Sequence, residues 1–243
     1  MSSSPEYGRA FSLWRSASAS VWQRYVHHEF VEQLGAGTLP REAFLHYLRQ
    51  DYVFLFHFAR AWALAAAKAD TLAEMQACAE TSHALVHVEM PLHVKICAAE
   101  GISQQQLEAT LEEPENLAYT RYVLESGYSG DFLDLLAALA PCVLGYGEIG
   151  LRLAAERESV ASAGESAGSS ASPYQGWIDT YSGAEFQEAC RTVGELIDAA
   201  AMRRLGADWE NQPRWVALTK RFETATRLEV GFWGMGLRGG VPA

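Results

Sequence analysis

The spacing of the apolar residues is the feature that most restricts the fold of this chain. Around residues 44–62 the large apolar side chains lie on one face of a helix: Phe44, Leu48, Leu55, Phe58 and Trp62. The same spacing appears in Leu135, Leu139, Tyr146, Ile149 and Leu153. No convincing segment alternates apolar and polar residues over the length of a strand with hairpin turns. The sequence therefore predicts an all-α fold.

Prolines and polar runs divide this pattern into separate helices. The expected helices are residues 6–34, 41–68, 71–100, 103–111, 114–128, 131–158, 183–205 and 209–238. Small polar residues in E-S-A-G-S-S-A-S predict a flexible Ser/Gly/Ala-rich loop at about 159–173. Ser182 and Glu185 have the spacing of a capping box, which predicts a helix start. Both flanks of the loop are helical, so we expect one domain over residues 1–243.

The charge and the hydropathy of the chain argue against several classes of partner. Nineteen Lys and Arg against thirty Asp and Glu give a net charge of −11, which repels nucleic-acid phosphates. No uninterrupted apolar stretch reaches the roughly 18 residues of a membrane span, and no signal peptide is recognisable. We therefore expect a cytoplasmic protein without nucleic-acid or membrane partners. Its four cysteines lack a C-x-x-C pair, so reduced thiols are expected.

Three polar residues occupy positions where the helical spacing calls for an apolar side chain. Asp51 lies on the apolar face of the helix predicted at 41–68, and Glu229 on the apolar face of the helix predicted at 209–238. Cys142 lies on the apolar face of the helix predicted at 131–158, which also carries Leu135 and Leu139. A buried carboxylate needs a donor or a proton. Pro141 cannot donate to the carbonyl four residues earlier, so the helix should bend or loosen beside Cys142.

Each of these residues also has a structural interpretation. An inward carboxylate can be a cap or half of an ion pair, and buried cysteines are most often packing residues. Pro141 can simply accommodate a crossing helix. The spacing shows that each residue faces a core and does not show that the three face each other, although ligand pockets of α-bundles are built from such side chains.

Several longer segments resemble the TenA family of thiaminase II or aminopyrimidine aminohydrolase enzymes. They occur in the family's order: G-T-L-P-R-E-A-F-L-H-Y-L-R-Q-D-Y, A-Y-T-R-Y, L-A-A-L-A-P-C-V-L-G-Y-G-E-I-G, Y-Q-G-W-I-D-T-Y-S-G-A-E-F and E-V-G-F-W-G-M. The resemblance covers almost the whole chain. It implies a haem-oxygenase-like helical bundle, usually a homotetramer, and the cysteine places this chain in the family's cysteine-bearing branch.

The resemblance also implies roles for individual residues. Cys142 matches the family's nucleophile, and Tyr146 matches the tyrosine that hydrogen-bonds it. Glu229 matches the carboxylate that contacts the pyrimidine ring and acts as general acid. Asp51 matches the carboxylate that binds the amino side of the ring.

Aromatic residues of the family's pocket are matched as well. Tyr119 and Tyr181 correspond to pocket tyrosines, and Phe232 to the aromatic residue that packs against the ring. Phe54 stands where some members have tyrosine, so a hydroxyl group is absent there. The implied substrate is 4-amino-5-aminomethyl-2-methylpyrimidine or thiamin, the implied product is hydroxymethylpyrimidine, and no metal or cofactor is required.

Parts of the sequence are also compatible with other functions. Glu80, His83, His87, Glu89 and His93 lie in one helix and permit a di-metal oxygenase, although a solvated or subunit-contact face is the commoner outcome. A non-catalytic regulator lacks a basic recognition helix. Haem binding would need a proximal histidine, for which His27 or His28 would have to serve.

Glu148 lies off the apolar stripe that carries Cys142. We therefore expect it on a polar face of its helix.

Overall fold

The computed structural model describes residues 5–162 and 172–239, and within them it contains helices and no strand. The all-α prediction is confirmed. In chain order the elements are α1 (Arg9–Ala17), α2 (Ala19–Val26), α3 (Glu29–Ala36), α4 (Arg41–Lys68), α5 (Leu72–Ala84), the π-helix η1 (Leu85–Glu89), α6 (Met90–Ala99), α7 (Gln104–Glu108), α8 (Pro114–Ser129), α9 (Phe132–Ser162), α10 (Gln175–Ser182), α11 (Ala184–Leu205), the 3-10 helix η2 (Trp209–Asn211) and α12 (Pro213–Arg238).

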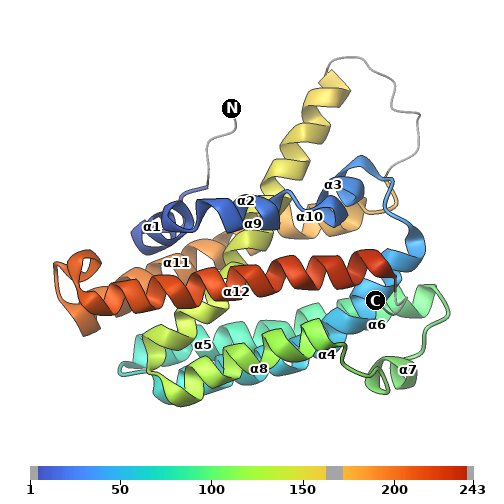
Figure 1. Ribbon diagram of the computed structural model, residues 1–243. Coiled ribbons are helices and arrows are strands. Elements are labelled where there is room, and N and C mark those ends of the chain that lie inside the picture. The colour runs from blue at the N-terminus through green and yellow to red at the C-terminus, as the bar shows by residue number, and fades with distance from the viewer. Residues whose placement is uncertain (1–4, 163–171, 240–243) are drawn as a thin grey trace.

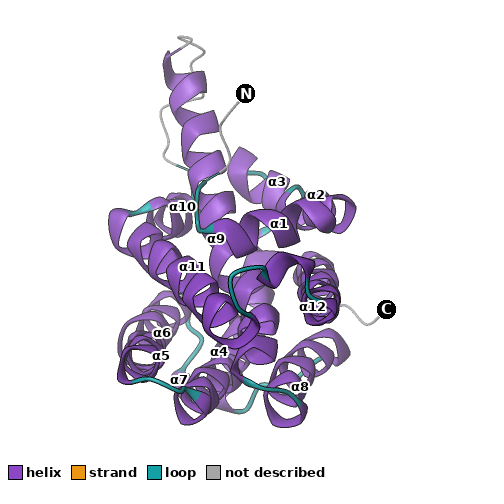
Figure 2. Ribbon diagram, turned by 90° about the vertical axis from the view of Figure 1, so that its left-hand side faces the viewer, coloured by secondary structure: helices purple, strands orange, loops and turns teal. Residues whose placement is uncertain are grey.

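Helix α9 crosses the middle of the bundle, and its C-terminal turns extend beyond the other helices (Figure 1). It packs against α8, α10, α11 and α12, while α4, α8 and α12 pack against one another on one side of it (Figure 2). By length and composition alone α9 qualifies as a membrane span, although Asp134 and Glu148 interrupt its apolar run, as expected from the sequence. However, 94% of its most apolar window is buried inside the protein, as in a core helix.

Three glycines of the segment G-Y-G-E-I-G allow neighbouring helices to approach α9 closely. A Cβ atom on Gly145 would lie 2.2 Å from Cε1 of Tyr25 in α2, and one on Gly150 would lie 2.5 Å from the carbonyl carbon of Tyr181 in α10. A Cβ atom on Gly147 would lie 2.6 Å from the Cys190 sulfur in α11. These contacts bring three helices against the part of α9 that follows Cys142.

Pro141 lies inside α9 without ending it, so the expected loosening did not interrupt the helix. The hydroxyl of Tyr25 donates a hydrogen bond to the Pro141 carbonyl at 3.2 Å, which ties α2 to this turn. Helix α9 also continues to Ser162, so the first residues of the loop expected at 159–173 are helical. Residues 163–171 of that loop lie outside the described residues.

Several predicted helix boundaries are wrong. The helix expected at 6–34 is three helices, with breaks at Ser18 and at His27 and His28. The second break is capped, because His28 Nδ1 accepts a hydrogen bond from the Phe30 amide at 3.1 Å. Helix α10 was not predicted. Ser182 belongs to its last turn, so Gly183 rather than Ser182 precedes α11, and the predicted capping box does not form.

The helix expected at 71–100 begins as predicted but changes its winding in the middle. Thr71 caps α5 by accepting a hydrogen bond from the Glu74 amide at 3.2 Å. The π-helix η1 then follows over Leu85–Glu89, and α6 begins at Met90. A π-turn inserts an extra residue and shifts the face on which later side chains lie.

Glu148 contradicts the prediction of a polar-face residue. Its side chain is buried, and it accepts hydrogen bonds from Trp22 Nε1 at 3.2 Å and from an Arg15 nitrogen at 3.1 Å. An arginine from α1 supplies the opposite charge, so the carboxylate is paired rather than solvated.

The close approach at Gly145 gives a direct stability test. We expect Gly145→Ala to lower the free energy of unfolding by about 1–3 kcal/mol, because fully buried Tyr25 has no room to move. The matched control is Gly176→Ala in α10, where an added Cβ meets no atom within 4 Å. That change should leave the stability equal or raise it by up to about 1 kcal/mol. Urea unfolding of both variants is the measurement, and equal stabilities would contradict the close packing.

Candidate active site

Asp51 of α4 is buried and shares one of its carboxylate oxygens between two donors. His93 Nε2 lies 2.7 Å from Oδ2, and the Tyr47 hydroxyl donates to the same oxygen at 3.3 Å. The described residues supply no hydrogen bond to Oδ1, the other oxygen. The predicted inward orientation of Asp51 is confirmed, and Oδ1 is left as an acceptor for another molecule.

Glu229 of α12 is also buried, in a less polar setting. Its Oε1 accepts a hydrogen bond from the Tyr119 hydroxyl at 2.8 Å. Burial raises the pKa of Glu229, the Tyr119 bond lowers it, and the charge of Asp51 raises it again, to about 8. At neutral pH the group therefore carries a proton and can give it up.

Cys142 of α9 is partly buried and lies within the electrostatic reach of several carboxylates. Burial raises the pKa of the Cys142 thiol well above its usual range, and the charges of Glu229, Asp51 and Glu89 raise it further. The resting side chain is thus a thiol. A thiolate can form there only when a nearby group accepts the proton.

Tyr146 does not hydrogen-bond Cys142 among the described residues, contrary to what the family pattern implies. Its hydroxyl lies 3.5 Å from the hydroxyl of Tyr47, which is within 3.4 Å of Trp177 Nε1. The Tyr146 ring packs against Tyr181, with ring centroids 5.0 Å apart. Tyr146 therefore joins the chain of polar groups that ends at Asp51.

Aromatic rings connect the two carboxylates. The Phe54 ring lies 5.0 Å from that of Tyr119 and 5.5 Å from that of Phe232, and Phe232 lies 6.2 Å from Tyr47. Faces of this kind pack against flat heterocycles. The eight residues singled out in the sequence thus come from α4, α8, α9, α10 and α12 to one place.

Two residues of this site were misplaced by the sequence reasoning. Glu89 at the end of η1 accepts a hydrogen bond from the Tyr181 hydroxyl at 3.0 Å, and burial raises its pKa. His93 of α6 faces Asp51. Their spacing of four residues is the available signal in the sequence, but it equally suits a metal site or a solvated face, and neither of these forms at Glu89 and His93 in the described structure.

Other members of that histidine- and glutamate-rich helix do face solvent. Glu80, His83 and His87 are exposed. Within residues 5–162 and 172–239, no group of three or more His, Cys, Asp or Glu side chains is arranged to hold a metal ion. Glu89 and His93 instead turn toward Tyr181 and Asp51.

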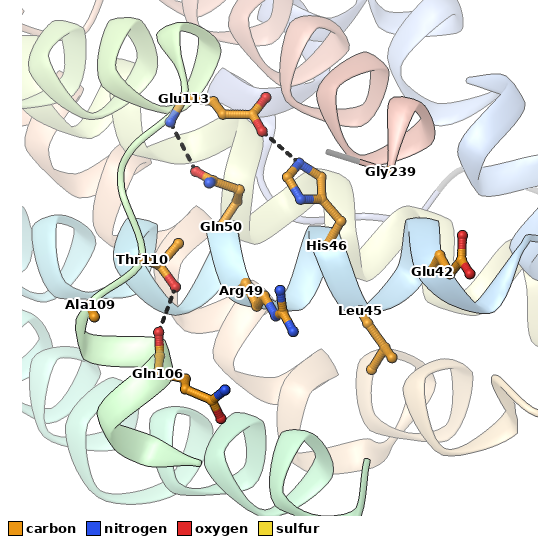
Figure 3. Close-up of a pocket in the computed structure, with 10 residues that line it drawn as sticks. All are labelled: Glu42, Leu45, His46, Arg49, Gln50, Gln106, Ala109, Thr110, Glu113 and Gly239. Atoms are coloured by element: carbon orange, nitrogen blue, oxygen red, sulfur yellow. Dashed lines mark hydrogen bonds and ion pairs between the residues drawn. The ribbon is translucent and has the colours of Figure 1, made fainter. Parts of the chain in front are cut away.

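A surface pocket lies elsewhere, between α4, α7 and the end of α12 (Figure 3). Its volume is about 710 Å³, and none of the eight predicted site residues lines it. Some of its polar groups pair with one another: His46 lies 2.9 Å from the Glu113 carboxylate, and the Glu113 backbone amide donates to Gln50 at 3.2 Å. Gln50 therefore lines this pocket, whereas the neighbouring Asp51 turns toward His93 and Tyr47.

The all-α bundle with this aromatic, acidic interior defines a known class of proteins. Residues 15–239 match the TENA/THI-4/PQQC family, and the chain belongs to that family. The predicted family membership is confirmed.

Individual relatives match most of the chain. The crystal structure of a TenA family transcription regulator from Silicibacter sp. TM1040 has 60% sequence identity and a TM-score of 0.88, and the match covers 95% of this chain and 97% of that one. An uncharacterized protein from Haemophilus influenzae is 39% identical over 89% of this chain and 93% of its own. An aminopyrimidine aminohydrolase from Halalkalibacterium halodurans is 34% identical over 93% of this chain and 94% of its own.

The raised pKa of Glu229 can be measured without any substrate. We expect the infrared band of a protonated carboxyl group to persist at neutral pH and to vanish as the pH rises through about 8. Glu229→Gln should remove the band, and Tyr119→Phe should move its loss to higher pH, since the Tyr119 hydrogen bond lowers this pKa. A wild-type band that disappears near the ordinary glutamate pKa would contradict this environment.

Proposed function

We propose that the chain is a hydrolase of thiamin metabolism, an aminopyrimidine aminohydrolase or thiaminase II. Its substrate would be 4-amino-5-aminomethyl-2-methylpyrimidine or thiamin, and its product hydroxymethylpyrimidine. One observation carries the proposal. The Cys142 thiol lies within electrostatic reach of two carboxyl groups, Asp51 and Glu229, which have different environments. The name of the H. halodurans relative supports it.

The two carboxylates suit different edges of one pyrimidine ring. Asp51 Oδ1 accepts no hydrogen bond from the described residues, so it is available to the hydrogens of an exocyclic amine. Glu229 carries a proton that a ring nitrogen can take. Phe54, Tyr119 and Phe232 offer faces against which the ring can pack.

In the proposed reaction the Cys142 sulfur bonds to the ring carbon next to the substituted position. The electron pair of the attacked double bond moves toward the ring nitrogen, which takes the Glu229 proton. The exocyclic amino group on the ring then donates its electron pair into the ring, a double bond forms between the ring and the methylene carbon, and the ammonium substituent leaves as ammonia, or the thiazolium of thiamin as neutral thiazole. Water bonds to this methylene carbon and loses a proton, and the electron pair returns to the ring. The cysteine leaves as a thiolate while the ring nitrogen returns its proton to Glu229, which restores the double bond of the ring.

The proton of the thiol is the first obstacle in this reaction. Burial and the neighbouring carboxylates keep Cys142 protonated in the free protein. The attack therefore has to be coupled to transfer of that proton to a group in the complex. Tyr146, one helical turn beyond Cys142, and Tyr181 supply hydroxyl groups at the same end of the site.

Replacement of the sulfur tests the proposed nucleophile. Cys142→Ser should keep the fold and bind the aminopyrimidine, because the change is nearly isosteric, but it should lose at least about 1,000-fold in kcat. Release of ammonia and formation of hydroxymethylpyrimidine are the measurements, with Cys78→Ser, a cysteine away from the site, as the control. Undiminished hydrolysis by Cys142→Ser would rule out the nucleophile role.

A comparison of the two substrates decides between degradation of thiamin and salvage. We expect kcat/KM for the aminomethylpyrimidine to exceed that for thiamin by more than about tenfold, because the site lies in a closely packed core and the thiazole needs more room. Equal or reversed values would make thiamin the physiological substrate. Both reactions yield the same pyrimidine product, so one chromatographic assay follows them.

The name of the Silicibacter structure raises transcription regulation as a second function. The net charge of −11 works against it, because binding to DNA depends mainly on neutralising phosphates. We expect no gel shift with promoter DNA of thiamin genes at moderate salt, with or without added pyrimidine. A specific, saturable shift would establish regulation as a further role.

A further inference from the structure

The ring of His93 is held at both nitrogens by groups that only accept hydrogen bonds. Nε2 lies 2.7 Å from Oδ2 of Asp51, and Nδ1 lies 3.0 Å from the backbone carbonyl oxygen of Glu89. A neutral imidazole has one N–H and could donate to only one of these partners. The geometry therefore favours the doubly protonated, positively charged ring.

The backbone around η1 explains how both acceptors reach one ring. Glu89 is the last residue of the π-helix, and His93 lies four residues later, within α6. The backbone carbonyl oxygen of Glu89 contacts Nδ1 of the ring, while the Glu89 side chain accepts a hydrogen bond from Tyr181 in α10. This arrangement points Nε2 of His93 at α4 and at Asp51.

The titratable groups that face His93 act in the same direction. They are Asp51 and Tyr47 from α4, Glu89 from η1, and Tyr181 from α10, which contacts Glu89. Burial opposes a charge on the ring, but the hydrogen bond and the charge of Asp51, with the charge of Glu89, outweigh it and raise the pKa of His93 to about 9.

We infer that His93 is a positioning residue that acts through Asp51. As an imidazolium it binds Oδ2 of Asp51, fixes the direction of the carboxylate, and leaves Oδ1 free to accept hydrogen bonds from the exocyclic amine of an aminopyrimidine. It also supplies the positive charge that offsets a carboxylate buried among other acids. The inference rests on the proposed function for its kinetic consequences only.

Kinetics with a double-mutant cycle test the action through Asp51. His93→Gln should raise KM for the aminopyrimidine by about 10- to 100-fold, the range for one charge-assisted hydrogen bond, with a smaller effect on kcat. In the Asp51→Asn background, His93→Gln should raise KM by less than about twofold. The control is His87→Gln, an exposed histidine six residues earlier in η1, which should behave as wild type. Independent, multiplying effects of His93→Gln and Asp51→Asn would overturn the inference.

Histidine NMR provides a readout that needs no activity. In the wild-type protein the His93 ring should titrate at a pH of about 9, and in Asp51→Asn the midpoint should fall. A His93 ring that is neutral at pH 7, or unmoved in Asp51→Asn, would overturn the inference even if His93→Gln failed to fold. If the wild type turned over no aminopyrimidine, the proposed function would fail while this titration still decided the state of the ring.

Discussion

The close packing of α9 is the constraint on which the rest of the structure depends. Its glycines let α2, α10 and α11 approach within distances that a methyl group would forbid. Because these helices carry Tyr25 and Tyr181, the approach also shapes the site next to Cys142. The same motif thus determines both the fold and the surroundings of the sulfur.

Burial of several acids in one core requires a different solution for each. Asp51 is paired with the imidazolium of His93, Glu229 retains its proton, and Glu148, farther along α9, is paired with Arg15. An unpaired buried carboxylate would be costly in each place. All three groups are carboxyl groups, and their different partners give them different chemical roles.

Much of this structure could be predicted from the sequence, because buried apolar residues recur with the period of a helix. Asp51 and Glu229 interrupt apolar stripes, and both proved to be inward-facing. The role of Glu89 and His93 could not be predicted in the same way, since η1 changes the helical period over the residues that end at Glu89 and precede His93. Asp51 lies in the uninterrupted helix α4, where the period of 3.6 residues holds.

Helix ends were predicted less well than helix faces. The break at His28 depends on a histidine cap, and histidine is not among the usual capping residues. The short helix α10 is defined by its packing on α9 through Tyr181 rather than by a long apolar stripe. Glu148 was misjudged because its partner, Arg15, is 133 residues away in the chain.

The acidic surroundings of Cys142 have a consequence for the lifetime of the protein. Oxidants and alkylating agents attack thiolates far faster than thiols. Because burial and the neighbouring carboxylates suppress the thiolate, this sulfur is shielded chemically as well as sterically whenever the site is empty. We therefore expect the Cys142 sulfur of the free protein to react with such reagents more slowly than an exposed cysteine of ordinary pKa.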